Sequence, residues 1–226
     1  MSNRRSLMPV RIVTDSTADI SPQQAQALGI TIIPLTVFFG EDTYLDGTEL
    51  DNVGFYTKLQ ESKVFPRTSQ PSPTVFQEAY IRLIDAGADG ILSVHISSKL
   101  SRTYQCACAA RDTLPDDVKK IPIEIIDSQS VSVGMSQDVL QAAREARSGM
   151  GLEEIKAHLL DQLSRTRILG VLDTLEYAKV GQQLAQALNT TYQGDISTYK
   201  FGAVLGAHGG PGSVAVAVIT ARKSQE

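Results

Sequence analysis

The chain has 226 residues, of which 42% are hydrophobic and 20% charged, and its formal net charge at neutral pH is −4. This length and apolar content suffice for a buried core and exclude a disordered chain. The acidic balance argues against nucleic-acid and anionic-membrane partners, which select basic surfaces. No stretch has the length and apolarity of a signal peptide or a membrane span. We therefore expect a cytoplasmic protein with no stable membrane insertion.

The apolar periodicity predicts strands and helices that alternate along most of the chain. The expected strands are residues 10–13, 30–39, 90–96, 122–126 and 168–172. The expected helices are residues 21–29, 52–63, 74–86, 99–114, 135–147, 152–164 and 174–188. Turns or loops are expected over residues 40–47 and 65–73, and a glycine-rich turn is expected between residues 203–205 and 214–220.

This alternation is typical of an α/β protein with a mainly parallel sheet flanked by helices. Strands become fewer after residue 152 and the turn chemistry changes. The sequence therefore predicts an N-terminal α/β lobe over residues 8–151 and a smaller α+β lobe over residues 152–226.

Hydroxyl-rich clusters follow three of the expected strands, where ligands bind in open α/β sheets. These clusters are residues 14–17, 97–101 and 127–128, and a fourth lies in the loop 68–72. One such cluster alone is more often a helix cap. Four at the mouth of one sheet favour a carboxylate or phosphate, because hydroxyls beside helix N-termini donate hydrogen bonds near a partial positive charge. Asp15 and Asp127 would repel an anion, so we interpret them as acceptors that hold the loops.

Residues 206–212 contain four glycines, Pro211 and His208. This composition predicts a tight turn that approaches a ligand closely, with a histidine able to donate to an anion. The alternative is a glycine hairpin with an exposed histidine. It is not a P-loop, because no Lys-Ser/Thr pair follows. His95 is expected in the core and His158 on a solvated helix face. No metal-ligand spacing is present.

Together, these motifs resemble the DegV family of bacterial fatty-acid-binding proteins. The resemblance rests on seven segments in the family's order, namely residues 12–19, 44–47, 68–72, 97–104, 127–128, 172–177 and 206–212. It implies a fatty acid, such as palmitate or stearate, bound between two lobes. It implies that the carboxylate is held by Thr68 or Ser69, Ser97 or Ser98, and His208. Supporting positions are assigned to Asp15, Ser16, Asp127, Ser128, Arg102 and Gly209.

The resemblance also implies that the chain is not an enzyme and uses no metal or cofactor. Its implied partner is a separate fatty acid kinase subunit that phosphorylates the bound acyl chain. Three departures from the family are visible: Arg102 replaces a glycine, Val180 and Gln183 replace arginines, and the stretch before Gly206 is short. We therefore expect a shortened C-terminal lobe, which would leave the acyl tunnel open on one side.

Two other functions stay open at this point. A degenerate family member could serve a regulatory or structural role. A small-molecule enzyme could use His208 as a base or a phosphate carrier.

Overall fold

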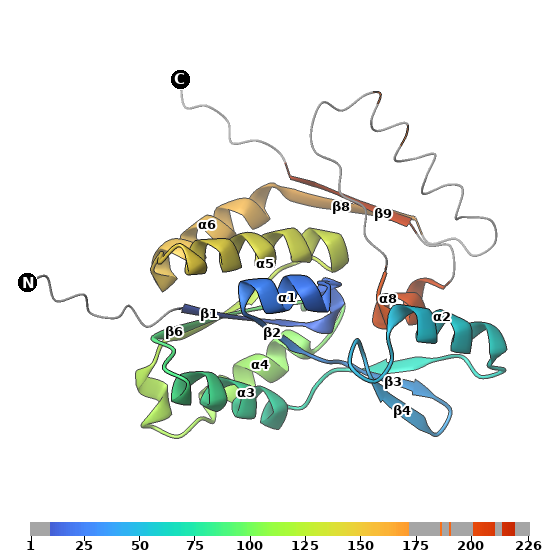
Figure 1. Ribbon diagram of the computed structural model, residues 1–226, viewed down its shortest axis with the longest axis horizontal. Coiled ribbons are helices and arrows are strands. Elements are labelled where there is room, and N and C mark those ends of the chain that lie inside the picture. The colour runs from blue at the N-terminus through green and yellow to red at the C-terminus, as the bar shows by residue number, and fades with distance from the viewer. Residues whose placement is uncertain (1–9, 172–185, 187–189, 191–200, 211–213, 220–226) are drawn as a thin grey trace, which may run out of the picture.

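The central element of the fold is a four-stranded parallel sheet, seen in a computed structural model that describes residues 10–171, 186, 190, 201–210 and 214–219 (Figure 1). Its strands run in the order β2-β1-β6-β7. They are β1 (Val10–Asp15), β2 (Ile30–Ile33), β6 (Gly90–His95) and β7 (Ile123–Asp127). Every residue of β6 is buried, as expected of a strand covered on both faces. The predicted fold class is confirmed.

Helices cover both faces of this sheet (Figure 1). One layer contains α1 (Pro22–Leu28), α5 (Ser132–Arg147) and α6 (Leu152–Arg165). The other contains α3 (Pro73–Asp85) and α4 (Thr103–Asp112). Met135 and Ile155 are fully buried on the first face, and Phe76 and Tyr80 on the second. Burying an apolar side chain of this size contributes roughly 1.5–3 kcal/mol to folding.

A second, antiparallel sheet lies beyond the end of the first and has its own apolar cluster (Figure 1). Its strands run in the order β4-β3-β5 and are β3 (Thr36–Phe39), β4 (Asp42–Leu45) and β5 (Arg67–Ser69). Two helices pack on it, α2 (Asn52–Glu61) and α8 (Ala203–Gly209). Phe55 of α2 is fully buried, packs against the Phe39 ring and belongs to the same apolar cluster as Val204 of α8.

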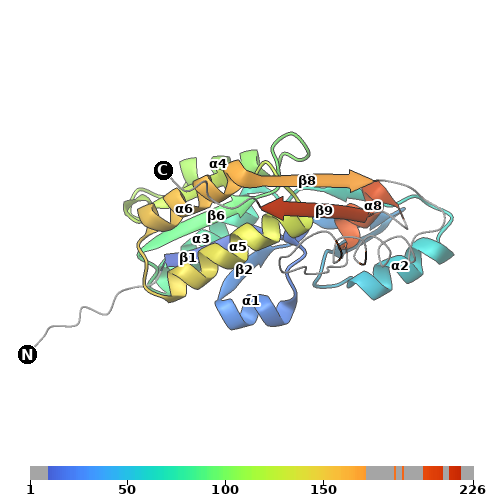
Figure 2. The same ribbon diagram turned by 90° about the horizontal axis from the view of Figure 1, so that it is seen from above.

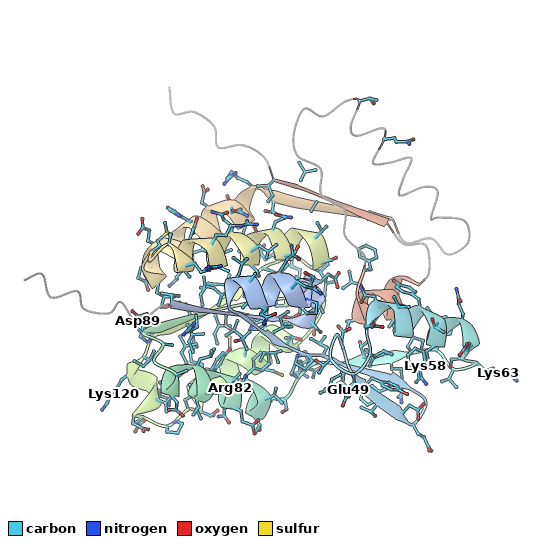
Figure 3. The ribbon with its side chains drawn as sticks, viewed as in Figure 1. Glu49, Lys58, Lys63, Arg82, Asp89 and Lys120 are labelled. Carbon is cyan, nitrogen blue, oxygen red and sulfur yellow. The ribbon has the colours of Figure 1, made fainter. Side chains whose placement is uncertain are left out.

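Polar side chains, among them Glu49 and Lys58 in Figure 3, connect strand β4 to the turn that follows it and to α2. Glu49 accepts a hydrogen bond from the Leu45 N–H at 2.8 Å. Lys58 pairs with Asp42 at 3.3 Å and lies over the Tyr44 ring. These contacts hold β4 against the turn that follows it and against α2.

A third sheet, made of only two strands, lies against α5. It comprises β8 (Thr166–Val171) and β9 (Val214–Ile219), which run antiparallel and side by side (Figure 2). Helix α6 begins at the predicted lobe boundary, and its Leu152 and Ile155 share the apolar cluster of α5. The division at residue 152 stays a prediction.

Several local predictions were wrong. The single strand expected over residues 30–39, in which Pro34 favoured an edge or a bend, is two strands in two sheets, because Pro34 has no N–H for a continuous ladder. Residues 42–45 and 67–69, expected in a turn and a loop, form β4 and β5 by pairing with β3. The helix expected to start at residue 99 starts at Thr103. The helix expected over residues 174–188 lies outside the described residues, apart from position 186.

The predicted glycine turn was also wrong, since residues 203–209 are helical. The N–H of Gly206 donates to the Gly202 carbonyl, and that of Gly210 donates to the Gly206 carbonyl, each at 2.9 Å. Ala203 and Val204 are buried in the cluster of the second sheet, which stabilises the helix despite its glycines. Within the described ranges, no helix combines the length and apolarity needed to cross a membrane.

Candidate functional site

A threonine and a histidine that are 140 residues apart meet at the surface of the second sheet. Thr68 lies on β5 and His208 in the last turn of α8, and the distance from Oγ1 to Nε2 is 2.8 Å. His208 is exposed and Thr68 is partly buried. The pair therefore places a hydroxyl and an imidazole side by side, close enough to contact the same ligand atom. Such a pair can donate to an anionic oxygen without a buried lysine or arginine.

Helix α8 carries His208, and its placement depends on a close approach to α2. A Cβ at Gly206 would lie 2.6 Å from Phe55 Cε1 and 2.9 Å from Tyr56 Oη. Only glycine allows α8 to lie at this distance from two aromatic rings. This explains one of the glycines in the motif around His208.

The loop after β6 places the second pair of predicted residues. Ser97 is buried, and its N–H donates to the Ser130 carbonyl at 2.9 Å. The N–H of Ser98 donates to Asp127 Oδ1 at 3.1 Å. Asp127 also accepts from the Gln129 N–H at 2.9 Å. It is therefore a scaffold acceptor, in agreement with the prediction from the sequence.

The predicted ligand-binding residue Ser69 and the remaining supporting positions have different surroundings. Ser128 donates through Oγ to the Ser130 carbonyl at 3.2 Å, and Ser16 Oγ accepts from the Leu35 N–H at 3.1 Å. Ser69 donates to the Gln70 carbonyl at 3.1 Å. Arg102 is exposed beside the start of α4, and Gly209 ends α8. The ligand-binding role of each of these residues stays a prediction.

A buried hydrogen-bonded chain connects β6 to β1. Tyr80 Oη lies 2.9 Å from Ser93 Oγ, which lies 2.7 Å from His95 Nε2, and His95 Nδ1 lies 3.0 Å from Asp15 Oδ2. All four side chains are fully buried. The order Ser-His-Asp resembles a hydrolase triad, but no substrate can reach Ser93 in this arrangement. Burial also raises the pKa of Tyr80, whose hydroxyl stays neutral.

Asp15 extends this series of hydrogen bonds to the carboxyl end of the parallel sheet. Its Oδ2 also accepts from the Ile96 N–H at 3.0 Å, and its Oδ1 accepts from the Thr17 N–H at 3.1 Å. The network fixes the end of β6 just before Ser97, and His95 is the satisfied core histidine that was predicted. The sequence analysis missed Ser93, although a serine two residues before a histidine in an apolar strand lies on the same face of the sheet.

Three carboxylates, Asp15, Asp19 and Asp46, surround the short 3-10 turn η1 (Ser16–Ala18) that follows β1. Burial raises the pKa of Asp19 to about 7 and that of Asp46 to about 6, and the neighbouring carboxylates add to both increases. At the start of α8, Asp19 accepts a hydrogen bond from the Gly202 N–H, and Asp46 faces the next N–H, that of Ala203, which lowers its pKa. Sequence analysis assigned no role to either residue. In the described part of the chain, no group of three or more His, Cys, Asp or Glu could hold a metal ion.

Comparison with protein-family profiles matches residues 9–181 to the DegV family, described as uncharacterised proteins. A DegV domain-containing protein of Halalkalibacterium halodurans is 36% identical over 178 residues, which cover 79% of this chain and 62% of that protein. This chain thus spans less than two thirds of the length of such relatives.

Solved structures extend the comparison. A structure reporting fatty acid binding of a DegV family protein from Thermus thermophilus has a TM-score of 0.74 and 25% identity, covering 94% of this chain and all of that one. A stearic acid-binding protein from Eubacterium ventriosum has a TM-score of 0.66 and 26% identity, covering 79% of this chain and 61% of that one. Both proteins are described as binding fatty acids.

Proposed function

Because this chain belongs to the DegV family, we propose that it binds a long-chain fatty acid by its carboxylate and its acyl tail. The proposed head-group residues are Thr68, Ser69, Ser97, Ser98 and His208. The observation that carries the proposal is the 2.8 Å contact between Thr68 and His208, which joins two motifs from distant parts of the chain. The two solved relatives described as fatty-acid-binding proteins give it further support.

The energetics suit a neutral head-group site. Burial of an acyl chain supplies roughly 0.8 kcal/mol per CH₂, so a sixteen-carbon tail supplies on the order of 12 kcal/mol before ordering costs. The head group then needs orientation and satisfied hydrogen bonds more than additional affinity. Hydroxyls and a histidine provide these without the desolvation cost of burying a lysine or arginine.

The test is direct. Purified protein is denatured and extracted, and the extract is examined by mass spectrometry for fatty acids. Delipidated protein is then titrated with palmitate and stearate by calorimetry. The proposal expects co-purified fatty acid and saturable binding at one site. An empty protein that also fails to bind either added acid would refute it.

As the second part of the proposal, the chain acts in the cytoplasm as a carrier that presents the fatty acid to a separate kinase subunit and performs no chemistry itself. The test combines delipidated protein, fatty acid, ATP and a fatty acid kinase catalytic subunit. Acyl phosphate should form only when both proteins are present. Formation of acyl phosphate by this chain alone, or no gain on adding it to the kinase subunit, would contradict the carrier role.

A further inference from the structure

We propose that Asp19 and Asp46 are positioning residues that hold the N-terminus of α8 and thereby place His208 beside Thr68. This inference deepens the proposed function and rests on it. It assigns a role to two carboxylates that lie outside the head-group residues and belong to different elements of the fold.

The contacts at the start of α8 carry the inference. Asp19 Oδ1 accepts a hydrogen bond from the Gly202 N–H at 2.8 Å, and Asp19 Oδ2 accepts one from the Ser132 hydroxyl. The Asp46 carboxylate faces the Ala203 N–H and the Ser16 hydroxyl, and both groups lower its pKa and so favour its charged form. The first N–H groups of a helix have no partner within the helix. Two carboxylates from separate loops bond the backbone where α8 begins.

The length of α8 makes these bonds important. Seven residues at a rise of 1.5 Å each give a helix of about 10 Å, and a helix this short is not stable in isolation. Its position must therefore come from tertiary contacts. The apolar contacts of Ala203 and Val204 fix one side of the helix, while the Asp19 and Asp46 bonds fix its N-terminal end.

The backbone around the contact between Asp19 and Gly202 has a constrained geometry. A Cβ at Gly202 would collide with the Asp19 carboxylate. Asp19 has a φ of 51°, a left-handed conformation that aspartate and asparagine tolerate better than most residues. Ser132, which donates to Asp19, has the same φ. Non-glycine residues in this region persist where surrounding contacts determine their conformation.

The electrostatics add to the argument. Removing carboxylates from water costs free energy unless hydrogen bonds compensate. Burial raises the pKa of Asp19 to about 7 and that of Asp46 to about 6, with repulsion from Asp46 and Asp15 adding to the first and repulsion from Asp15 to the second, so the charged form of each is disfavoured. The hydrogen bonds to α8 offset part of this cost for both residues.

A double-mutant cycle separates positioning from general stability. Fatty acid affinity is measured in Asp19→Ala, Asp46→Ala, His208→Ala and the two double variants with His208→Ala. We expect about a tenfold loss from either aspartate variant in the wild-type background and less than a twofold loss in the His208→Ala background. Asp19→Asn should stay within about threefold of wild type, because asparagine keeps an acceptor for the Gly202 N–H and tolerates the left-handed φ.

Asp138→Ala is the matched control. Like the other two aspartates, Asp138 is buried (1% exposed), and burial raises its pKa to about 7. It lies on α5 and accepts a hydrogen bond from the Gln162 side-chain amide at 2.7 Å, so its contacts are with other elements than α8. Its replacement should lower the unfolding midpoint while changing affinity less than twofold. Equal losses of affinity from Asp19→Ala in both backgrounds, or a loss in Asp138→Ala as large as in Asp19→Ala, would overturn the inference.

A second readout needs no ligand. The ring signals of His208 are recorded by NMR in the ligand-free protein, with Thr68→Ala as the reference for a lost contact. Asp19→Ala and Asp46→Ala should shift these signals toward the Thr68→Ala values, and Asp138→Ala should not. Unchanged signals in both aspartate variants would overturn the inference. If the wild-type chain binds no fatty acid, the proposed function fails, and this readout still decides the positioning role.

Stability does not confound the design. If one alanine variant fails to fold, the other carries the same cycle and the same NMR readout, because the two carboxylates bond different N–H groups of α8. If both fail, Asp46→Asn and Asp19→Asn provide the folded pair. Each asparagine keeps one acceptor oxygen where the carboxylate has two, so the His208 signals should shift partly toward the Thr68→Ala values, and unchanged signals in both Asn variants would overturn the inference.

Discussion

Replacing Gly206 by alanine tests how tightly α8 is held against α2. Two effects of the added methyl group oppose each other. Alanine favours a helix over glycine by up to about 1 kcal/mol. The methyl group would, however, lie 2.6 Å from Phe55 Cε1 and 2.9 Å from Tyr56 Oη. Overpacking of this kind typically costs about 1–3 kcal/mol.

The surroundings decide which effect is larger. Phe55 is fully buried, and its ring packs at 5.7 Å from that of Phe39 and 5.1 Å from that of Tyr56, so it has no free space to enter. We expect Gly206→Ala to lower the free energy of unfolding by about 1–2 kcal/mol and to weaken fatty acid binding, because α8 and His208 must shift away from Thr68.

Urea unfolding and calorimetric titration measure the two quantities. Gly151→Ala is the control, since no atom lies within 4 Å of the added methyl and Gly151 precedes α6, far from His208 in the chain. It should cost less than about 1 kcal/mol, through a poorer N-cap, and leave affinity unchanged. A Gly206→Ala variant as stable as wild type, with the same affinity, would refute the close-approach argument.

Three further predictions follow from the polar groups. In calorimetric titration, Thr68→Ala should weaken fatty acid binding roughly tenfold, the size expected for one hydrogen bond. Thr68→Ser should keep most of the affinity, because it keeps the hydroxyl, and equal losses from the two variants would count against a role for that hydroxyl. Ser93→Ala should lower the free energy of unfolding in urea by about 1–3 kcal/mol, because it leaves the buried Tyr80 hydroxyl and His95 Nε2 without their shared partner. An unchanged free energy of unfolding would contradict the network. The free energy of unfolding should fall as pH rises from 5 to 8, because a raised carboxyl pKa means that the folded state binds more protons than the unfolded state between about pH 4 and 7. Asp138→Asn should remove up to about 1.4 kcal/mol per pH unit of this slope, and an unchanged slope would show that its pKa is not raised.

The sequence predicted the central sheet well, and the reason is visible in β6. A strand buried on both faces is a continuous apolar run, so Gly90–His95 was clear without any tertiary information. Strands β4 and β5 were not predictable in the same way. Their residues show turn chemistry beside Gly40 and Pro66, and they become strands only by pairing with β3.

Helix α8 shows a different limit of prediction. Its glycines lower helix propensity, so local reasoning predicts a turn. Burial of Val204 and the bonds from Asp19 and Asp46 override that preference. Both aspartates lie inside segments that carried the family resemblance, but their spacing gave no indication that they bond to a helix 150 or more residues away.

The candidate site was partly predictable for a similar reason. Motif order grouped Thr68 with His208, and the structure places them in contact. Neither periodicity nor spacing could have paired them, because contact requires β5 and α8 to pack together. The buried chain from Tyr80 to Asp15 was missed because hydrogen bonds between side chains on different elements leave almost no pattern in a sequence.

The break at Pro34 has a thermodynamic consequence. It sends the chain from one sheet into another, so Thr68 and Ser97 are anchored in two separately cored parts of the molecule. A carboxylate that is hydrogen-bonded by both Thr68 and Ser97 would act as a non-covalent crosslink between those two apolar cores. At a ligand concentration of a hundred times Kd, such a crosslink is worth about 2.7 kcal/mol. Fatty acid should therefore raise the unfolding temperature of both parts together.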